Sequence, residues 1–290
     1  MENPVYLNGE FLPLSEARIS VLDRGFLFGD GVYEVIPAYG GRPFRLAEHL
    51  QRLQRSLDAI RLNNPYSDGD WRRLLQQLLA RTPGEDQGIY LQITRGAAPK
   101  RDHAIPAGVA PTVFAMCSPI LPPSPQIAAE GIDAVCREDS RWLRCDIKAI
   151  TLLANVLLRA QAADEDALEA ILIRDGQVTE GAASNLFLVR DGRIATPPKS
   201  ELLLAGITRD LILELAQAQG LPWEERPIAA AELVQADELW LSSSTRELLP
   251  VTRLDGQAVA NGRPGPIWQQ MNGYYQDYKA SLRTSKAEQA

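Results

Sequence analysis

The stretch Arg141-Trp-Leu-Arg-Cys-Asp-Ile-Lys148-Ala-Ile-Thr-Leu-Leu-Ala-Asn155 joins a polar, charged segment to an apolar one. The apolar residues after the lysine recur at helical spacing, and they are Ile150, Leu152, Leu153, Val156, Leu157 and Ala160. This pattern predicts that Lys148 stands at the start of a helix, next to buried apolar surface. Burial disfavours the ammonium form of a lysine, and a neutral amine can attack a carbonyl carbon to form a Schiff base. The alternative is an ordinary lysine whose methylene groups cover apolar surface while its ammonium group stays in water.

Lysine is scarce in this chain, which has 30 Lys and Arg residues but only five lysines. The other four lie in loop-like or tail-like sequence, and they are Lys100, Lys199, Lys279 and Lys286. Arginine cannot act as the nucleophile instead, because its guanidinium group stays protonated. Lys148 is therefore the best candidate for covalent chemistry.

The composition argues against several classes of protein. A net charge of -7 disfavours binding of a nucleic-acid backbone as the main task. The three cysteines and two histidines are not spaced for a disulfide framework or a zinc site, so no metal is expected. The first residues lack a signal-peptide pattern, and no apolar run reaches membrane-spanning length. The sequence therefore predicts a cytoplasmic protein with reduced thiols that binds neither membrane nor nucleic acid.

Turn signals and periodicity predict an α/β protein of the α+β type, in which hairpins build mixed or antiparallel sheets flanked by helices. Three hairpins turn on Asn-Gly or Asp-Gly pairs: Asn8-Gly9, Asp175-Gly176 and Asp191-Gly192. Three amphipathic helices are predicted: residues 45–62, a segment starting near Ser67, and a segment starting near Gly206. Three glycines within the segment 23–31 indicate a bent, tightly packed backbone.

A proline-rich segment divides the chain. Ser118-Pro-Ile-Leu-Pro-Pro-Ser-Pro125 has four prolines in its last seven residues, a composition typical of a stiff, extended connector. We therefore predict a smaller N-terminal domain at residues 1–118, a linker at residues 119–126, and a larger C-terminal domain at residues 127–290 that carries Lys148.

Three places in the N-terminal part could contact a ligand. Tyr33 is either a half-buried strand residue or a phenol presented to a ligand. Arg52 falls on the side of its helix away from the apolar stripe, which favours a solvated arginine. The cationic loop from Arg95 to His103 is either a solvated turn or a carboxylate trap, in which a guanidinium grips both oxygens and a histidine adds a donor.

The C-terminal part offers three further candidates. Glu180 ends a strand, and is either a surface group or a carboxylate that holds a ring nitrogen protonated. Gly206-Ile207-Thr208 starts a helix, where backbone N–H groups and a hydroxyl suit a phosphate as well as a simple threonine cap. The hydroxyls of Ser242-Ser243-Ser244-Thr245 follow a strand, and form either a turn or a second half of the same phosphate cradle.

Six motifs occur in an order that resembles the class IV, or fold-type IV, pyridoxal-phosphate aminotransferases. They are DRGFLFGDGVYEV (23–35), EHLQRL (48–53), RWLRCDIK (141–148), TEGAASNLF (179–187), GITRD (206–210) and SSSTREL (242–248). The resemblance covers about residues 5–275. RCDIK, and an Arg-x-His in the loop before the linker, are most similar to the D-amino-acid aminotransferases of this family.

The resemblance implies pyridoxal 5′-phosphate as cofactor, bound between the domains. Lys148 would carry it as an aldimine and move the proton between the substrate Cα and the cofactor C4′. Glu180 would keep the pyridine nitrogen protonated, so that the ring acts as an electron sink. Arg52 would bind the phosphate, and Leu204 would pack on the ring. Backbone N–H and hydroxyl groups would complete the phosphate cradle, from Ile207, Thr208, Ser243 and Ser244.

The resemblance also assigns the substrate site. Tyr33, Arg101 and His103 would hold the substrate carboxylate, with Arg101 and His103 reaching in from the partner subunit of a homodimer. Two departures bear on this assignment. The loop has one residue more between Pro99 and Arg101 than the family pattern, and Ala182-Ala183 stands where D-specific members often have two serines.

The activity implied is a ping-pong transamination between a D-amino acid, such as D-alanine, and a 2-oxo acid, such as 2-oxoglutarate. A branched-chain L-amino-acid or (R)-amine transaminase and an aminodeoxychorismate lyase are the alternatives within the family. A non-catalytic protein that binds pyridoxal phosphate is the alternative from another class.

Overall fold

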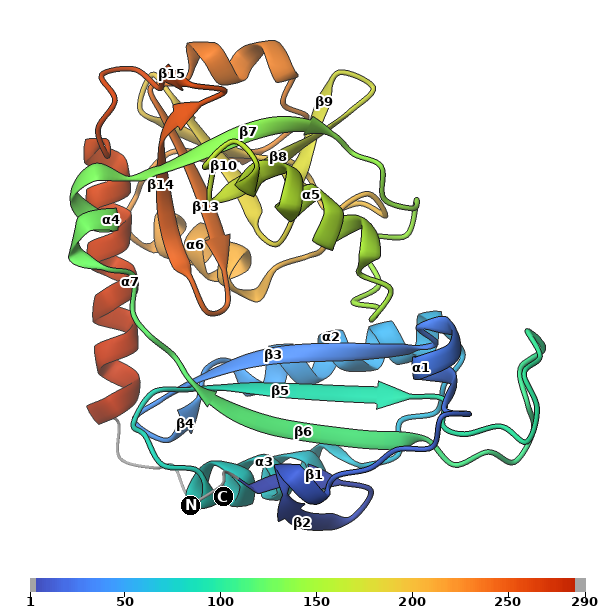
Figure 1. The fold of residues 1–290 in the computed structure, drawn as a ribbon. Helices are drawn as coiled ribbons and strands as arrows, with labels where there is room; N and C mark the ends of the chain where they lie inside the picture. The colour runs from blue at the N-terminus through green and yellow to red at the C-terminus, as the bar shows by residue number, and fades with distance from the viewer. Residues whose placement is uncertain (1–3, 285–290) are drawn as a thin grey trace. The chain divides into compact units, whose positions relative to one another are not determined.

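The structure is a computed structural model that describes residues 4–284 (Figure 1). The chain forms two compact units. Unit 1 consists of the chain up to Leu121, of Ile147–Thr151, and of the chain from Ser281 on; unit 2 consists of Pro122–Asp146 and Leu152–Ala280. Lys148 therefore groups with unit 1, whereas the sequence analysis placed it in the C-terminal domain.

Unit 1 contains a six-stranded antiparallel sheet in the order β2-β1-β6-β5-β3-β4. Its strands are β1 Pro4–Leu7, β2 Glu10–Pro13, β3 Gly31–Tyr39, β4 Arg42–Pro43, β5 Gln87–Thr94 and β6 Thr112–Pro119. β3, β5 and β6 run side by side (Figure 1). The predicted hairpin between β1 and β2 is confirmed, because Asn8 and Gly9 both adopt the positive φ that a tight turn requires, 49° and 106°.

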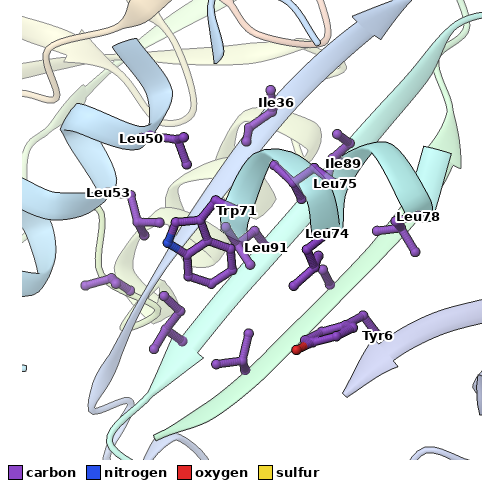
Figure 2. Packing of buried hydrophobic residues seen from close by; sticks show 14 of the residues in the cluster. Tyr6, Ile36, Leu50, Leu53, Trp71, Leu74, Leu75, Leu78, Ile89 and Leu91 are labelled. Atoms are coloured by element: carbon purple, nitrogen blue, oxygen red, sulfur yellow. The ribbon is translucent and has the colours of Figure 1, made fainter. Parts of the chain in front are cut away.

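Two amphipathic helices, α2 (Leu46–Ala59) and α3 (Asp68–Arg81), pack on this sheet as predicted. Ser67 caps α3 by accepting a hydrogen bond from the Asp70 N–H, and the Asp70 carboxylate accepts one from the Ser67 N–H. Figure 2 shows Trp71 of α3 in one cluster with Leu53 of α2 and Leu91 of β5. This cluster is the hydrophobic core of unit 1.

The glycine-rich segment packs closely against β5, as its composition predicts. A Cβ at Gly25 would lie 2.3 Å from Thr94 Cγ2, and a Cβ at Gly31 would lie 2.6 Å from the Ile93 carbonyl oxygen. The segment also forms a short helix, α1 (Arg24–Phe28), that the glycine spacing did not predict. Its first turn is capped by the Asp23 carboxylate, which accepts a hydrogen bond of 2.8 Å from the Gly25 N–H.

Lys148 does not stand at a helix start, and that prediction was wrong. α5 (Leu153–Ala163) begins five residues later. The segment Ile147–Thr151 instead runs along the edge of β3. The Tyr33 N–H donates to the Lys148 carbonyl over 2.9 Å, and the Ile150 N–H donates to the Gly31 carbonyl over 3.1 Å. β4 pairs only with the far end of β3, so the edge at its start would otherwise leave backbone groups unpaired.

The predicted apolar stripe of α5 is also not the face that packs on unit 2. Leu158 and Ala162 are buried, whereas Leu153, Val156 and Leu157 are 72%, 59% and 55% exposed. The spacing indicated a helix correctly, but it did not identify the buried face, because this helix is apolar on two sides.

Unit 2 contains a nine-stranded mixed sheet, in which β7 is parallel to β14 and β8 while most other pairs are antiparallel. Its strands are β7 Ile132–Glu138, β8 Glu169–Arg174, β9 Gln177–Gly181, β10 Asn185–Arg190, β11 Arg193–Thr196, β12 Trp223–Glu225, β13 Glu238–Ser243, β14 Glu247–Leu254 and β15 Gln257–Ala258. The hairpins β8–β9 and β10–β11 turn on Asp175-Gly176 and Asp191-Gly192, all at positive φ, as predicted. The predicted class, mixed and antiparallel sheets flanked by helices, is confirmed.

Two of the remaining helices depart from the sequence predictions. The remaining helical elements are η1 Leu14–Glu16, α4 Pro125–Glu130, α6 Ile207–Ala218, η2 Ala230–Gln235 and α7 Pro266–Thr284. α4 begins within the predicted linker, capped by Ser124. Lys279 is not a tail residue: it is buried on α7 and paired with the buried Glu247, because Trp268, Met271, Tyr275 and Lys279 share the inward face of the helix. Lys286 lies outside the described residues.

Within residues 4–284, no helix is long and apolar enough to cross a bilayer. The same residues contain no group of three or more His, Cys, Asp and Glu that could hold a metal ion, and all three cysteines are free thiols. The cytoplasmic location stays a prediction from the sequence.

The core of unit 1 allows a direct test. Leu75 is fully buried, so Leu75→Ala is expected to lower the free energy of unfolding by about 2–5 kcal/mol, through lost burial and a residual cavity. Leu14, which is half exposed, is the matched control, and Leu14→Ala should change the free energy by less than about 0.5 kcal/mol. Urea unfolding of both variants measures the difference, and equal losses would contradict this packing.

Candidate active site

The backbone N–H and the backbone carbonyl of Lys148 are both hydrogen-bonded within unit 1. Its N–H donates to Ser56 Oγ on α2 over 3.2 Å, and its carbonyl accepts from the Tyr33 N–H. Its Nζ lies 4.2 Å from the centre of the Tyr33 ring, within the range of a cation–π contact. The backbone is thus fixed while the amine stands over a half-buried phenol, so two of the predicted site residues, Lys148 and Tyr33, lie side by side.

Arg52 is buried, and the interpretation as a solvated arginine was wrong. Its Nε donates to Glu34 Oε1 over 2.8 Å, and its Nη2 donates to Glu34 Oε2 over 2.7 Å. This is the two-pronged geometry in which a guanidinium binds a carboxylate most strongly. Burial would raise the pKa of Glu34, but Arg52 outweighs it and holds that pKa far below its usual range. Glu34 is therefore a fixed anion that orients Arg52.

His49 completes this buried cluster. Its Nδ1 lies 2.8 Å from Glu34 Oε2, while its Nε2 is buried with no hydrogen-bond partner among the described residues. Burial lowers the pKa of His49, and the charges of Arg52 and Lys148 act in the same direction, against the opposing effect of Glu34. A neutral His49 with an open nitrogen is suited to meet a polar ligand atom.

Glu34, His49 and Ser56 were not predicted as site residues, although the sequence carries a signal for them. His49, Arg52 and Ser56 follow one another at i, i+3 and i+7 beside the apolar stripe of α2, so they share one polar flank. Glu34 alternates with Val32 and Ile36 on the inward face of β3, where a charge needs a buried partner.

Arg101 and His103 lie in the exposed loop between β5 and β6. Both contact the same aromatic side chain: Arg101 Cζ lies 4.9 Å from the centre of the Phe28 ring, and the His103 ring lies 5.2 Å from it. The structure thus brings the two predicted carboxylate-binding residues together. It places them against α1, a short helix whose side chains the sequence analysis had not assigned to the site.

In unit 2, Glu180 is a buried carboxylate with three donors. Arg141 Nη1 lies 2.5 Å from its Oε1, while Asn185 Nδ2 and the Leu204 N–H donate to its Oε2 over 3.2 and 3.1 Å. Burial raises the pKa of Glu180 to about 7, although Arg141 and the Leu204 N–H oppose the shift. The interpretation as a surface group was wrong, because β9 ends inside the unit.

Arg141 is itself fixed by a second carboxylate that the sequence analysis did not single out. Its Nε and Nη2 each donate to Asp139 over 2.9 Å, and Asp139 also accepts a hydrogen bond from Thr179 Oγ1. Arg141 therefore carries one positive charge between two buried acids. Glu180 has a fixed orientation and a tunable charge, which suits it to face a basic ring nitrogen.

The start of α6 has the features of an anion-binding site. Gly206 is its N-cap, and a Cβ there would lie 2.0 Å from Asn185 Oδ1, so the close approach requires glycine. The backbone N–H groups of Ile207 and Thr208 belong to the first helical turn, which has no carbonyl partners within the helix. Thr208 Oγ1 is buried without a hydrogen-bond partner among the described residues. A buried donor left open at a helix N-terminus fits a phosphate group.

The serine-rich segment at residues 242–245 lies next to this anion-binding site. Ser242 pairs with Asn185 across β13 and β10, and its Oγ is buried without a partner in the described part of the chain. Ser243 and Ser244 follow directly, both half-buried, and Ser243 Oγ accepts a hydrogen bond from the Arg246 N–H. Unit 2 thus brings together Glu180, Leu204, the start of α6 and the serine turn.

Comparison with known proteins agrees with these motifs. The family model described as amino-transferase class IV matches residues 31–254. The D-alanine aminotransferase of Bacillus licheniformis is 43% identical over 263 residues, which cover 91% of this chain and 92% of the relative. The branched-chain amino acid aminotransferase of Escherichia coli has a TM-score of 0.89 at 28% identity, covering 96% and 94% of the two chains. The T.th. branched-chain amino acid aminotransferase with pyridoxamine 5′-phosphate has a TM-score of 0.91 at 25% identity, covering 98% and 96%.

The raised pKa of Glu180 predicts how stability depends on pH. Between pH 4.5 and about 7 the unfolded chain has lost this proton while the folded protein keeps it, so a rise in pH favours unfolding. We expect the free energy of unfolding of ligand-free protein to fall by about 3 kcal/mol across this range, and Glu180→Gln to remove that fall. Urea unfolding between pH 5 and 8 measures the slope.

Glu232→Gln is the control for this measurement. Arg226 lowers the pKa of the Glu232 carboxyl group, which therefore titrates below this range, and its replacement should leave the slope unchanged. The prediction for Glu180 is wrong if Glu180→Gln and the wild-type protein lose stability equally between pH 5 and 8.

Proposed function

The chain belongs to the class IV aminotransferases, and from this premise we propose that it exchanges amino and oxo groups between a D-amino acid, such as D-alanine, and a 2-oxo acid, such as 2-oxoglutarate. One observation carries the proposal: the Lys148 amine stands over Tyr33 on a fixed backbone, in a chain 43% identical to a D-alanine aminotransferase over 91% of its length. The exchange would occur in two halves, in which the first amino acid leaves as an oxo acid before the second oxo acid binds.

Pyridoxal 5′-phosphate is the cofactor that the residues fit. When bound, it supplies an electron sink for the bond broken at the substrate Cα. Arg52, oriented by Glu34, and the open Thr208 hydroxyl at the start of α6 would bind its phosphate. Ile207, Ser243 and Ser244 would complete the phosphate cradle, and the half-buried Leu204 would pack on the ring. The solved T.th. relative was obtained with pyridoxamine 5′-phosphate.

Each side chain has a defined task in this proposal. The Lys148 amine would hold the cofactor aldehyde until the substrate amine replaces it there, and the freed amine would then move the proton between the substrate Cα and the cofactor C4′. Glu180 would face the pyridine nitrogen and keep it protonated, while Arg141 holds the carboxylate in place. Tyr33 would flank the amine and contact the substrate carboxylate.

The Arg-x-His motif formed by Arg101 and His103 is most similar to the D-amino-acid aminotransferases, and it supports the choice of a D-amino acid. A guanidinium and an imidazole in one loop supply two strong donors for a substrate carboxylate. The branched-chain relatives share the fold at 25–28% identity, and the D-alanine relatives share 39–43% identity. A branched-chain L-amino acid is therefore the second candidate substrate, and a direct comparison of the two enantiomers separates them.

We also propose a homodimer in which Arg101 and His103 serve the partner's site. Three exposed apolar side chains, Leu153, Val156 and Leu157, lie at i, i+3 and i+4 on α5 and form one continuous stripe. Soluble monomers rarely expose such contiguous apolar surface. In unit 1, Val21 and Phe26 are also strongly exposed. A second copy of this chain would bury these side chains.

Replacement of the lysine tests the proposed function directly. Lys148→Ala is expected to lower turnover of D-alanine by about 10³-fold or more, since both its covalent and its proton-transfer tasks are lost. Borohydride should attach the cofactor to the wild-type protein and not to the variant, as read by mass spectrometry. Lys199→Ala, an exposed lysine paired with Asp210, should behave like the wild-type protein.

A panel of D- and L-amino acids, scored for conversion of the cofactor spectrum to its amino form, distinguishes the alternatives. Conversion by D-alanine and not by L-leucine supports the proposal, and the reverse order identifies a branched-chain enzyme. Conversion by no amino acid would leave only a cofactor-binding protein.

The dimer has its own test. Leu157→Glu places a charge in the α5 stripe and should shift the mass measured by analytical ultracentrifugation from dimer toward monomer. Val234→Glu, at an exposed valine outside the stripe, should leave the mass unchanged. A monomeric wild-type protein would refute this part of the proposal.

A further inference from the structure

The loop that carries Arg101 and His103 is anchored by the glycine-rich segment before β3. At its start, the Arg24 N–H donates to the Gly96 carbonyl over 2.9 Å, and the Ala98 N–H donates to the Leu22 carbonyl over 3.3 Å. The Asp23 carboxylate joins both stems of the loop, because it accepts hydrogen bonds from Thr94 Oγ1 over 3.0 Å and from Thr112 Oγ1 over 2.6 Å. The stems of the loop are therefore fixed.

A buried side chain, that of Arg24, holds the tip of the loop. Its Nη1 donates to the Asp102 carbonyl over 2.5 Å, and its Nη2 lies 3.5 Å from the His103 carbonyl. Both acceptors belong to the backbone directly after Arg101. One guanidinium thus reaches both peptide groups that flank His103, directly after Arg101.

Arg24 is itself oriented by Asp30, an acid of the same glycine-rich segment. Arg24 Nε donates to Asp30 Oδ2 over 2.7 Å, and Arg95 grips the same carboxylate through Nε and Nη2 over 2.8 and 3.0 Å. Arg95 also donates to the Ile60 and Arg61 carbonyls, just after α2. The chain of contacts runs without a gap from the end of α2, through Asp30 and Arg24, to the loop tip.

Phe28 adds a contact to the side chains themselves. Its ring centre lies 4.8 Å from Arg24 Cζ and 4.9 Å from Arg101 Cζ, and the His103 ring lies 5.2 Å away. A guanidinium over an aromatic ring is held by cation–π attraction, which limits the rotamers of an otherwise exposed arginine. The backbone on either side of His103 and the side chain of Arg101 are thus restrained from the same short helix.

We propose that Arg24 and Phe28 are positioning residues that hold Arg101 and His103 ready to bind the substrate carboxylate. The inference rests on the proposed function, and it extends that function to residues that act through Arg101 and His103. A loop that is already ordered loses less conformational entropy when the substrate binds, so binding is tighter. It also places the donors closely enough for a two-pronged contact with the carboxylate.

The conservative variant Arg24→Lys tests the role of the guanidinium. A lysine keeps the charge but cannot bridge Asp30 and two carbonyls at once. In the single-turnover half-reaction with D-alanine, we expect the half-saturating concentration to rise about tenfold, while the limiting rate changes by less than about threefold. Amide hydrogen exchange, a readout independent of activity, should become faster in a peptide covering residues 99–105. Cofactor retention should match that of the wild-type protein.

A double-mutant cycle separates positioning from general damage. In a background that lacks the trap, Arg101→Ala with His103→Ala, adding Arg24→Lys should change the half-saturating concentration by less than about twofold. Arg226→Lys, which removes a guanidinium fork from Glu232 in unit 2, is the matched control and should leave both kinetic constants unchanged. Phe28→Leu keeps the Asp30 contacts and should raise the half-saturating concentration about threefold, so it serves if Arg24→Lys does not fold.

The outcomes distinguish this inference from the function it rests on. No half-reaction by the wild-type protein with any D-amino acid would refute the proposed function. A working wild-type enzyme refutes the positioning role alone if a folded Arg24→Lys or Phe28→Leu variant has the wild-type half-saturating concentration. The positioning role is also refuted if Arg24→Lys raises the half-saturating concentration about tenfold in the variant that lacks Arg101 and His103.

Discussion

The start of β3 has an open edge, and the backbone of residues 148–150 closes it. Two hydrogen bonds, from the Tyr33 N–H to the Lys148 carbonyl and from the Ile150 N–H to the Gly31 carbonyl, fix this segment. They bring a lysine that is distant in sequence to the ring of Tyr33 and to the polar flank of α2. Buried backbone groups must be paired, so the hydrogen bonds that complete the sheet edge also fix the position of the Lys148 amine.

Each unit contains buried acids that are matched by arginine, and these pairs orient the groups that the proposed chemistry uses. Glu34 holds Arg52 by a two-pronged contact, and Glu180 is held by Arg141. Removing one member of such a pair leaves an uncompensated buried charge, which is strongly destabilising. The pairs add little net stability over apolar packing, but they leave each side chain one orientation. The pKa values of these two acids therefore differ. The pKa of Glu34 lies far below its usual range, because its partners outweigh the effect of burial. The pKa of Glu180 is raised to about 7, because burial outweighs the effect of its partners.

The errors of the sequence analysis share one cause. Arg52 was assigned to solvent because the helical wheel shows only the helix to which it belongs, whereas the Glu34 carboxylate that buries it comes from β3. The lysine count treated Lys279 as a tail residue, although Glu247 pairs with it from a strand 32 positions earlier. The apolar stripe of α5 was read as a core face, although Leu158 and Ala162 form that face. In every case the deciding partner lies far away in the chain, and periodicity carries no information about it.

The amino-acid sequence by itself determined what depends on neighbouring residues. Asn8-Gly9 and the Asp-Gly pairs produced the hairpins, because only such residues enter positive φ easily, and Ser67 and Gly206 marked where helices begin. The order of the motifs also determined the family. Tertiary structure alone decided which charged groups are buried together, such as Glu34 with Arg52 and Glu247 with Lys279. Burial of a charge depends on a partner supplied by another element, and that pairing exists only once the chain has folded.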